Sequence, residues 1–353
     1  MKKCLVMFLF LCVLFIGSFG VPVFAKDVTK LTFSVYTPPT HQYAILGSKF
    51  CEEIKKRTNG RVEIAYYPGG TLTTATKVYQ GVVSGVSDIG MSHIAYTRGR
   101  FPVTEVADLP IGFPSGWVAT KVINEFYAKY KPKEWNDVHV LLLHGTGPNI
   151  IYTNKKPVKN LEDLKGLKIR GTGRIADTVK ALGATAMPFE MADVYEGMMR
   201  GVLDGVMGPI QQLKGWKTAE VSKYATACWQ IGSIFTFYIV MNKAAWNKLP
   251  ADIKEIFNQV SNEFMDKFGK VANEIDIEGK EELNKFKGQL IQLSDAEAQR
   301  WVKAVEPVVK DFTNSLVSKG HNKNDVDAYI QFIRERVQYW KNKEKEMGLL
   351  TVY

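Results

Sequence analysis

The sequence predicts an α/β protein built from two lobes of similar plan that face each other across a cleft. Three observations lead to this prediction. Segments with the alternating pattern of strands are interleaved with segments that have the four-residue spacing of helices. This order begins again near Asn149, and a short stretch of the first half is echoed in the second half.

The first residues have the pattern of an export signal. Two lysines precede an apolar run from Leu5 to Ile16, and helix breakers and a small-residue site ending at Ala25 follow. The run is shorter than the roughly 20 residues that span a bilayer. We therefore expect residues 1–25 to be a cleaved signal peptide and the mature protein to reside in the periplasm.

Charge and cysteine content narrow the classes of function. The chain of 353 residues has a formal net charge of +10, which suits an anionic ligand. Its basic residues are dispersed and form no stripe with aromatic side chains, so nucleic-acid binding is not expected. Cys51 and Cys228 remain after the signal, and we expect two buried thiols, although the compartment permits a disulfide.

The first half of the chain alternates between strand and helix patterns. Leu46, Phe50 and Ile54 recur every four residues, as on the buried face of a helix, and Asn59-Gly60 ends that helix. We expect strands at 31–36, 61–67, 88–92 and 138–143, and helices around 46–54, 74–84 and 118–130.

The second half repeats the alternation and then becomes nearly all helical beyond Ala251. Ser294 and Glu297 form a capping box at the start of one of these helices. The late helices are basic and amphipathic, and we expect their apolar faces to pack on the lobes. The expected elements are strands at 150–153 and 167–170, and helices around 175–182, 194–202 and 326–340.

One internal echo supports two lobes of similar plan. Gly85–Met91 and Gly201–Met207 share Gly, Val, Asp and Met at matching positions, and each follows a helix and enters a short strand. In open α/β sheets, ligands bind beyond the carboxyl ends of strands. Two such lobes would form a clamshell that closes by a hinge.

Arg170 is the sharpest candidate for ligand binding. It ends an apolar strand, just before Gly171-Thr172-Gly173 and a helix. A guanidinium there can hold a carboxylate through two parallel hydrogen bonds, and the helix N-terminus adds positive potential. The residues alone leave open a second interpretation, in which Arg170 is a surface arginine at a strand edge.

Catalysis has little support in the sequence. Residues 171–176 fit a dinucleotide fingerprint with Glu190 downstream, but this motif lies mid-chain in an exported protein. The histidines lack metal-ligand spacing, and no nucleophile elbow occurs. Ser92 and His93 are adjacent at a strand end, which favours ligand contact over a triad. We therefore expect no enzyme, no cofactor and no metal.

Several sequence blocks together resemble a known family. The chain is similar to the substrate-binding proteins of TRAP (tripartite ATP-independent periplasmic) transporters over nearly all of its mature length. The blocks that carry this resemblance are the loop 38–41 and the stretches 58–62, 67–72, 160–170 and 195–205.

The resemblance implies a two-lobed periplasmic binding protein with a long helix across both lobes and a helical C-terminal tail. Lobe 1 would comprise 26–148 plus about 236–275, and lobe 2 would comprise 149–235 plus about 276–353. The implied partners are a small carboxylate and the permease subunits of a TRAP transporter driven by an ion gradient. A monomer is expected.

The resemblance also assigns Arg170 to the substrate carboxylate. Gly208 stands where sialic-acid-type members place an asparagine, and Asn149 lies near the position of a second arginine in many members. Both departures point to a monocarboxylate with an apolar, oxo or aromatic portion. The remaining candidate ligand-binding residues are Tyr36, His41, Met91, Ser92, His93, Tyr96, Pro188, Phe189, Met207 and Gly208.

Other functions share some of these features. A receptor of an ATP-driven importer would have the same chemistry, and only the family resemblance separates the two. An exported enzyme that acts on a small acid and a ligand-sensing partner of a receptor kinase are the further alternatives.

Overall fold

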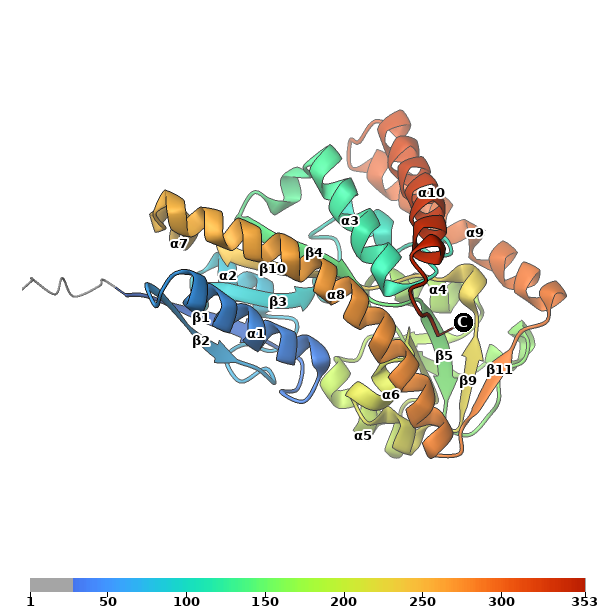
Figure 1. Cartoon of the computed structure of the whole chain (residues 1–353). Coiled ribbons are helices and arrows are strands. Elements are labelled where there is room, and N and C mark those ends of the chain that lie inside the picture. Colours follow the sequence, from blue (N-terminus) through green and yellow to red (C-terminus); the bar gives the residue numbers. More distant parts are fainter. Residues whose placement is uncertain (1–27, 353) are drawn as a thin grey trace, which may run out of the picture.

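The computed structural model describes residues 28–352, so the expected signal peptide lies outside the described residues. Two β-sheets, each covered by helices, form the body of the protein (Figure 1). Segments near the middle of the chain pass from one sheet to the other, and a long helix runs along both. The predicted α/β architecture of two lobes is confirmed.

The first sheet has the strand order β2-β1-β3-β10-β4. Its first three strands are parallel to one another, whereas β10 is antiparallel to both β3 and β4. The strands are β1 (Thr29–Val35), β2 (Val62–Tyr67), β3 (Ile89–His93), β4 (Val138–Gly145) and β10 (Thr236–Asn242). We call this sheet with its helices the first lobe.

The second sheet has the order β11-β9-β5-β8-β6-β7. Here β6, β7 and β8 are parallel, and β5 is antiparallel to β8 and β9. Its strands are β5 (Asn149–Thr153), β6 (Lys168–Arg170), β7 (Thr185–Met187), β8 (Gly205–Pro209), β9 (Tyr224–Ala227) and β11 (Gln289–Gln292). We call this sheet with its helices the second lobe.

Local sequence signals start many of the helices. Ser115 accepts a hydrogen bond from Val118 N at the start of α3, and Ser294 accepts one from Glu297 N at the start of α9, as its capping box predicts. The helices of the lobes are α1 (Gln42–Arg57), α2 (Val78–Val83), α3 (Gly116–Tyr130), α4 (Gly173–Ala181), α5 (Val194–Met199), α6 (Gln212–Gly215) and α7 (Lys243–Lys248). Three long helices follow: α8 (Ala251–Lys285), α9 (Asp295–Ser318) and α10 (Lys323–Glu346).

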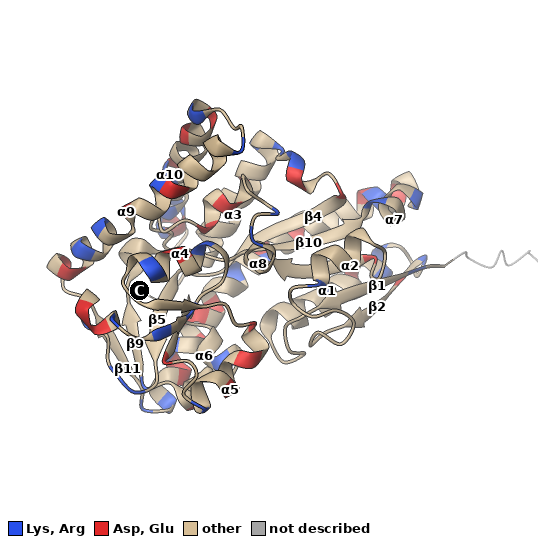
Figure 2. Ribbon diagram, turned by 180° about the vertical axis from the view of Figure 1, so that it is seen from behind, with Lys and Arg blue, Asp and Glu red and all other residues tan. Residues whose placement is uncertain are grey.

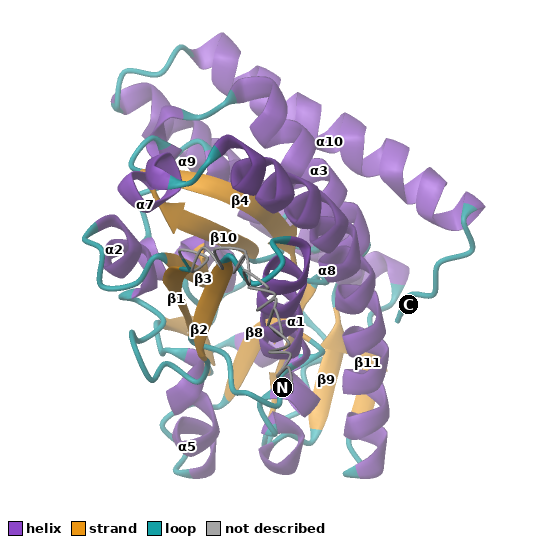
Figure 3. Cartoon of the chain, turned by 60° about the vertical axis from the view of Figure 1, so that its left-hand side comes forward, coloured by secondary structure: helices purple, strands orange, loops and turns teal. Residues whose placement is uncertain are grey.

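The chain passes between the lobes by three routes. It crosses from β4 to β5, from β9 to β10, and along α8, which Figure 3 shows beside both sheets. At the first crossing, Gly147 lies so close to α8 that an added Cβ would stand 1.6 Å from Asp276 Oδ2. A larger residue would therefore displace the long helix from the crossing strands.

The two C-terminal helices lie on different lobes. α9 packs against α4 of the second lobe, whereas α10 packs against α3 of the first lobe. A buried carboxylate fixes α10 in place, because Glu344 Oε1 accepts hydrogen bonds from Ser115 Oγ and from Asn273 Nδ2 on α8. This differs from the expectation that the whole tail belongs to the second lobe; the apolar face of α10 is covered by α3.

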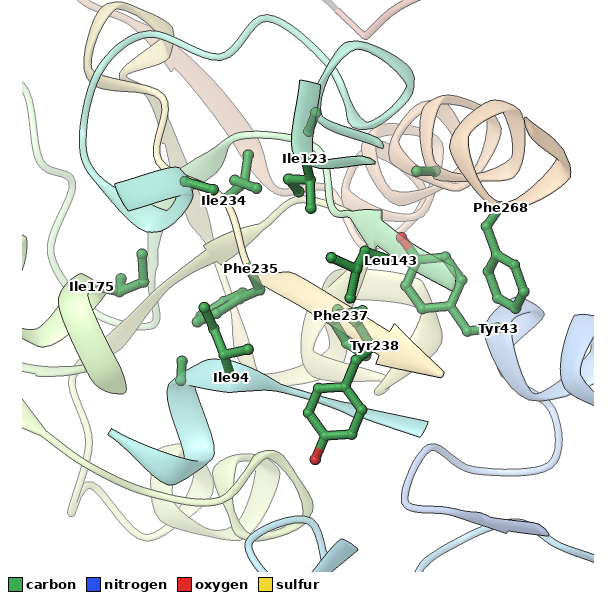
Figure 4. Close-up of a cluster of buried hydrophobic side chains, with 14 of the residues drawn as sticks. Tyr43, Ile94, Ile123, Leu143, Ile175, Ile234, Phe235, Phe237, Tyr238 and Phe268 are labelled. Atoms are coloured by element: carbon green, nitrogen blue, oxygen red, sulfur yellow. The ribbon is translucent and has the colours of Figure 1, made fainter. Parts of the chain in front are cut away.

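The core of the first lobe is rich in aromatic rings. Tyr43, Phe237 and Phe268 lie side by side in Figure 4. The ring of His144 is stacked between Phe237, at 4.8 Å, and Phe268, at 4.4 Å. Burial of each large ring contributes about 1.5–3 kcal/mol to folding. These contacts join β4, β10, α1 and α8 into one unit.

The outer surface is mixed in charge. Figure 2 shows Lys and Arg scattered among Asp and Glu along the outer helices of both lobes. Within residues 28–352, no helix combines the length and apolar character needed to cross a membrane. Cys51 and Cys228 are both buried and unbonded, as expected.

The sequence echo corresponds to equivalent structures in the two lobes. Asp88 Oδ2 accepts a hydrogen bond from Thr32 N on β1, and Asp204 Oδ2 accepts one from Lys168 N on β6. Each aspartate directly precedes the strand, β3 or β8, that leads to the space between the lobes. The sheet registers then make Ser34 the counterpart of Arg170.

Candidate functional site

A closed cavity lies between the lobes, where β1, β3, β6 and β8 end. Its side chains pack closely in this closed form, and the space open to a water-sized molecule is only about 10 Å³. Its lining residues come from both lobes and from the crossing strand before β10, and they are Tyr36, Thr37, His41, His93, Tyr96, Thr146, Arg170, Met191, Gln211, Gln212, Trp216, Phe235 and Phe237.

Arg170 lines this cavity with its side chain fully buried. Its Nε donates to Phe189 O at 3.0 Å and its Nη2 donates to Tyr96 OH at 3.3 Å, but no residue in the described part of the chain accepts a hydrogen bond from Nη1. No carboxylate within residues 28–352 forms an ion pair with it. A buried charge without a counter-ion is costly, so the Nη1 group is suited to donate to an anion that enters the cavity.

The backbone around Arg170 explains its position. β6 is held between β7 and β8, and the chain then turns through Gly171 into α4. An added Cβ on Gly171 would stand 3.1 Å from a methyl carbon of Val179, so the turn packs tightly on its own helix. The guanidinium therefore projects from a rigid strand end.

Aromatic rings form the wall opposite the guanidinium. Tyr36 meets Tyr96 edge to face at 5.4 Å and stacks on Trp216 at 6.0 Å. His93 stacks on Tyr96 at 3.9 Å, and the Arg170 guanidinium lies 5.6 Å from the ring centre of Phe235. Such a wall suits the apolar or planar part of a small ligand.

Among residues 28–352, Arg170 is the only charged group that lines the cavity. Burial lowers the pKa of His41 to about 4. The pKa of His93 lies well below its ordinary value because of burial and the nearby positive charge of Arg170. Burial also raises the pKa of Tyr36 well above its ordinary value. All three groups are therefore neutral near pH 7, and the cavity offers a single positive charge.

The structure brings some of the expected site residues together and leaves others apart. Those that line the cavity are Tyr36, His41, His93, Tyr96 and Arg170. Met91 and Met207 lie deeper in β3 and β8, where they are fully buried in the hydrophobic core. Ser92 points to the other face of β3, where its Oγ donates to Ala75 O at 3.0 Å.

Four further candidates border the site without lining the cavity. Phe189 contributes its carbonyl oxygen to Arg170, whereas Pro188 is exposed. Asn149 lies at the first crossing, where its Nδ2 donates to Ser233 Oγ at 3.3 Å. A Cβ on Gly208 would stand 2.2 Å from Gln212 Oε1, so this glycine makes room for a cavity side chain.

Other lining residues escaped the sequence analysis. Gln211 and Gln212 follow the end of β8, and the same strand-end rule that selected His93 could have found them. Phe235 directly precedes β10 and Phe237 lies near its start, at the second crossing, where the sequence does not distinguish a core residue from a cavity-lining one. The remaining lining residues that were missed are Thr37, Thr146, Met191 and Trp216.

Direct contacts hold the two lobes together around the cavity. Arg174 on α4 forms a buried ion pair with Glu105 of the first lobe, with 2.7 Å between Nε and Oε2. An exposed pair joins Arg98 to Asp177 at 2.6 Å. In addition, Met191 N donates to Tyr96 OH at 2.9 Å. The lobes are therefore closed, and a ligand reaches Arg170 only when they separate.

Gly173 marks the closest approach between the lobes. It has a φ of +56°, and an added Cβ would stand 2.7 Å from the Cβ and 2.8 Å from the Cα of Ala95. Real Cβ atoms do not occur at such distances from backbone. The absence of a side chain at this position therefore allows the closed arrangement.

These features define the class of the protein. Two α/β lobes, joined by crossing segments and closed over a cavity with one buried guanidinium, make a two-lobed solute-binding protein. Residues 33–315 match the model of the bacterial extracellular solute-binding protein family 7, DctP, and the chain belongs to this family. The predicted family of TRAP substrate-binding proteins is thereby confirmed.

Similar proteins are known by sequence and by structure. The 2,3-diketo-L-gulonate-binding periplasmic protein YiaO of Escherichia coli (strain K12) is 28% identical over 233 residues, which cover 64% of this chain and 70% of the relative. A TRAP periplasmic solute-binding protein from Desulfovibrio salexigens, solved as an open complex, is 31% identical over 89% of this chain and 97% of its own, with a TM-score of 0.76.

A third similar protein was solved with its ligand. The TRAP periplasmic solute-binding protein from Bordetella bronchiseptica, with bound (R)- and (S)-mandelate, is 27% identical. The match covers 88% of this chain and 99% of that one, with a TM-score of 0.81.

Proposed function

We propose that this protein is the periplasmic solute receptor of a TRAP transporter. It binds a small monocarboxylate between its lobes and delivers it to the ion-gradient-driven permease subunits in the membrane. The observation that carries this proposal is the buried Arg170 guanidinium, whose Nη1 has no hydrogen-bond partner among residues 28–352. A ligand carboxylate supplies both the missing hydrogen bond and the missing negative charge.

The charge of the cavity favours one carboxylate over two. Of the described residues that line it, Arg170 is the only cation, since His41 and His93 are neutral near pH 7. A second carboxylate in the closed cavity would be buried without a counter-ion, which is costly. The aromatic wall favours an apolar, oxo or aromatic remainder, and the mandelate bound by the Bordetella bronchiseptica protein is an acid of this kind.

The proposed partner in the membrane is inferred from the family to which the chain belongs. The chain belongs to a family of solute-binding proteins, and we propose that it acts as a monomer without catalytic turnover. The lobes carry the ligand, and the permease subunits are the proposed receiving partner. A closed cavity excludes water and protects the ion pair with Arg170 during transfer.

The first test is thermal unfolding against a panel of mono- and dicarboxylates, with protein freed of co-purified ligand by unfolding and refolding. A ligand at about 100 times its dissociation constant adds roughly 2.7 kcal/mol of stability, which raises the Tm by a few degrees. A shift with monocarboxylates supports the proposal. Shifts only with dicarboxylates, or chemical conversion of the ligand on incubation, would contradict it.

Arg170→Ala provides the residue-specific test. Removal of one partner of a buried charged pair costs about 3–5 kcal/mol, so we expect affinity in calorimetry to fall at least about 100-fold. The matched control is Ser34→Ala, because Ser34 is the counterpart of Arg170 in the first lobe and does not line the cavity. Unchanged affinity of Arg170→Ala would remove this residue from the site.

A further inference from the structure

A hydrogen bond between two polar side chains joins the lobes near Arg170. His41 precedes α1 in the first lobe, and Gln211 lies between β8 and α6 in the second lobe. Their side chains meet across the cleft, with 2.9 Å between His41 Nε2 and Gln211 Oε1, and both residues line the cavity. The direction of this hydrogen bond determines what Gln211 can offer to a ligand.

The backbone fixes the tautomer of His41. Its Nδ1 accepts a hydrogen bond from Tyr43 N at 3.1 Å, as the cap of α1. A backbone N–H can only donate, so Nδ1 carries a lone pair and no proton. Burial keeps the pKa of His41 at about 4, so the ring is neutral near pH 7. The single ring proton is therefore on Nε2.

The tautomer in turn fixes the amide of Gln211. Because Nε2–H of His41 donates, the atom that it meets must be the amide oxygen, Oε1. No described residue accepts a hydrogen bond from the remaining group, Gln211 Nε2. The residue is held closely, since its backbone N donates to Asp276 Oδ1 at 3.3 Å and an added Cβ on Gly215 would stand 2.7 Å from His41 Cδ2.

The side-chain amide of Gln212 is oriented in the same way, with its oxygen bound by a protein donor. Tyr152 OH donates to Gln212 Oε1 at 2.7 Å, and Gly208 leaves the room for this side chain. Both amide oxygens at the end of β8 are thus occupied by protein donors. The N–H groups of two lining side chains remain for a ligand.

We propose that the cavity recognises a hydrogen-bond-accepting oxygen of the ligand, a keto or hydroxyl oxygen, through Gln211 Nε2, in addition to the carboxylate. His41 is the positioning residue that sets the direction of the Gln211 amide. This inference rests on the proposed function and narrows its ligand class to oxygen-substituted monocarboxylates. An ammonium group in the same place meets a donor and is rejected.

Calorimetry with four matched acids tests the assignment. Phenylglyoxylate and mandelate carry a keto and a hydroxyl oxygen, phenylacetate carries neither, and phenylglycine carries an ammonium group. We expect the first two to bind about tenfold or more tightly than phenylacetate, and phenylglycine to bind most weakly. Equal binding of all four, or no binding of the two oxygen-bearing acids, would overturn the proposal.

Gln211→Leu separates this inference from the proposed function. We expect it to abolish the preference for oxygen-bearing acids, while the loss of the hydrogen bond with His41 lowers the affinity for all four acids to a similar degree. Gln80→Leu, an exposed glutamine on α2, is the control and leaves the preference unchanged. A preference that persists in Gln211→Leu overturns the inference alone, whereas retained affinity in Arg170→Ala overturns the proposed function.

The role of His41 has its own readout. We expect ¹⁵N NMR of histidine-labelled protein at pH 7 to show the Nε2–H tautomer for His41, with or without ligand, because Tyr43 N belongs to the same lobe. His41→Asn keeps a capping acceptor for α1, but its shorter side chain places the amide N–H out of reach of Gln211, so we expect a folded protein without the preference. An Nδ1–H tautomer, or an intact preference in His41→Asn, would overturn the positioning role.

Discussion

The two lobes share one strand order but place different chemistry at the cleft. β2-β1-β3-β10-β4 in the first lobe corresponds to β7-β6-β8-β5-β9 in the second, with the same parallel and antiparallel pairs. In both, an aspartate before the central strand accepts from a backbone N–H of the neighbouring strand. At the matching strand end, however, the first lobe has Ser34 and the second lobe has Arg170.

This difference shows how two lobes with the same strand order can contribute different groups to one binding site. The second lobe supplies the cation and the amide donors, whereas the first lobe supplies Tyr36, His93 and Tyr96 as most of the ring wall. Neither lobe alone surrounds a ligand. Specific binding therefore depends on contacts that hold the lobes together, and these contacts are where the comparison can be tested.

The largest effect is expected at the buried ion pair between the lobes. Glu105→Gln removes the buried counter-charge of Arg174 in the closed form and leaves only Asp177, at 3.5 Å from Nη1, whereas water can solvate the guanidinium when the lobes part. Loss of one partner in a buried pair costs about 3 kcal/mol or more, so we expect ligand affinity to fall about 100-fold. Calorimetry measures the affinity, and small-angle scattering reports the more open average shape.

The exposed pair supplies the matched control for this prediction. Arg98→Gln breaks the contact with Asp177, and exposed pairs contribute about 1 kcal/mol or less. We therefore expect a change in affinity of fivefold or less. Equal effects of the two variants would show that the lobes are not held by the Glu105–Arg174 pair.

A smaller effect is expected from overfilling the contact between the lobes. Gly173→Ala places a methyl group against Ala95 and strains a residue with positive φ. Overpacking costs about 1–3 kcal/mol, so we expect affinity to fall roughly 30-fold. Gly183→Ala has the same kind of backbone strain, at a φ of +95°, but open space around its Cβ. It should lower the Tm without weakening binding; an equal loss of affinity in both variants would contradict the prediction.

The smallest effect is expected in the pH dependence of folding stability, to which His144 of the first lobe contributes. His144 is fully buried in the first lobe, neither ring nitrogen has a hydrogen-bond partner among the residues that the structure describes, and burial lowers its pKa to about 3. The unfolded chain, with an ordinary pKa near 6.5, binds the proton first as pH falls, so this group reduces stability below about pH 6.5. His144→Phe removes that loss.

We expect His144→Phe to gain about 1.4 kcal/mol over the parent protein between pH 7.5 and pH 5.5. Urea unfolding at the two pH values measures this gain. Tyr152→Phe in the second lobe is the control, because burial raises the pKa of that tyrosine above its ordinary value and no titration occurs in this range. If His144→Phe shows no such gain, the pKa of His144 in the folded protein is close to its ordinary value.

Much of the fold could be predicted because its signals are local. Period-two and four-residue patterns locate the strands and helices, and the repeated Gly-Val-x-Asp motif indicates two equivalent units. The position of Arg170 could be predicted because a residue between an apolar strand and a glycine turn lies at the carboxyl end of a strand, and the family resemblance then favoured a role in ligand binding. The position of α10 on α3 could not, since the apolar face of an amphipathic helix fits either lobe.

The rest of the site depends on contacts between distant segments. Trp216 follows α6, which has only four residues and no periodic signal. Phe235 and Phe237 lie where the second crossing passes the cavity, and only the folded arrangement separates core from cavity wall. The orientation of the Gln211 amide could not be predicted, because it depends on a hydrogen bond with His41, which lies across the cleft and 170 residues away in sequence.

The stacking of Trp216 on Tyr36 has a practical consequence. The indole belongs to the second lobe and the phenol to the first, with ring centres 6.0 Å apart. Separation of the lobes breaks this contact and changes the surroundings of the indole, which alters its fluorescence. Intrinsic tryptophan fluorescence should therefore report the separation of the lobes. Stopped-flow fluorescence could then measure the rate of ligand release without an added dye.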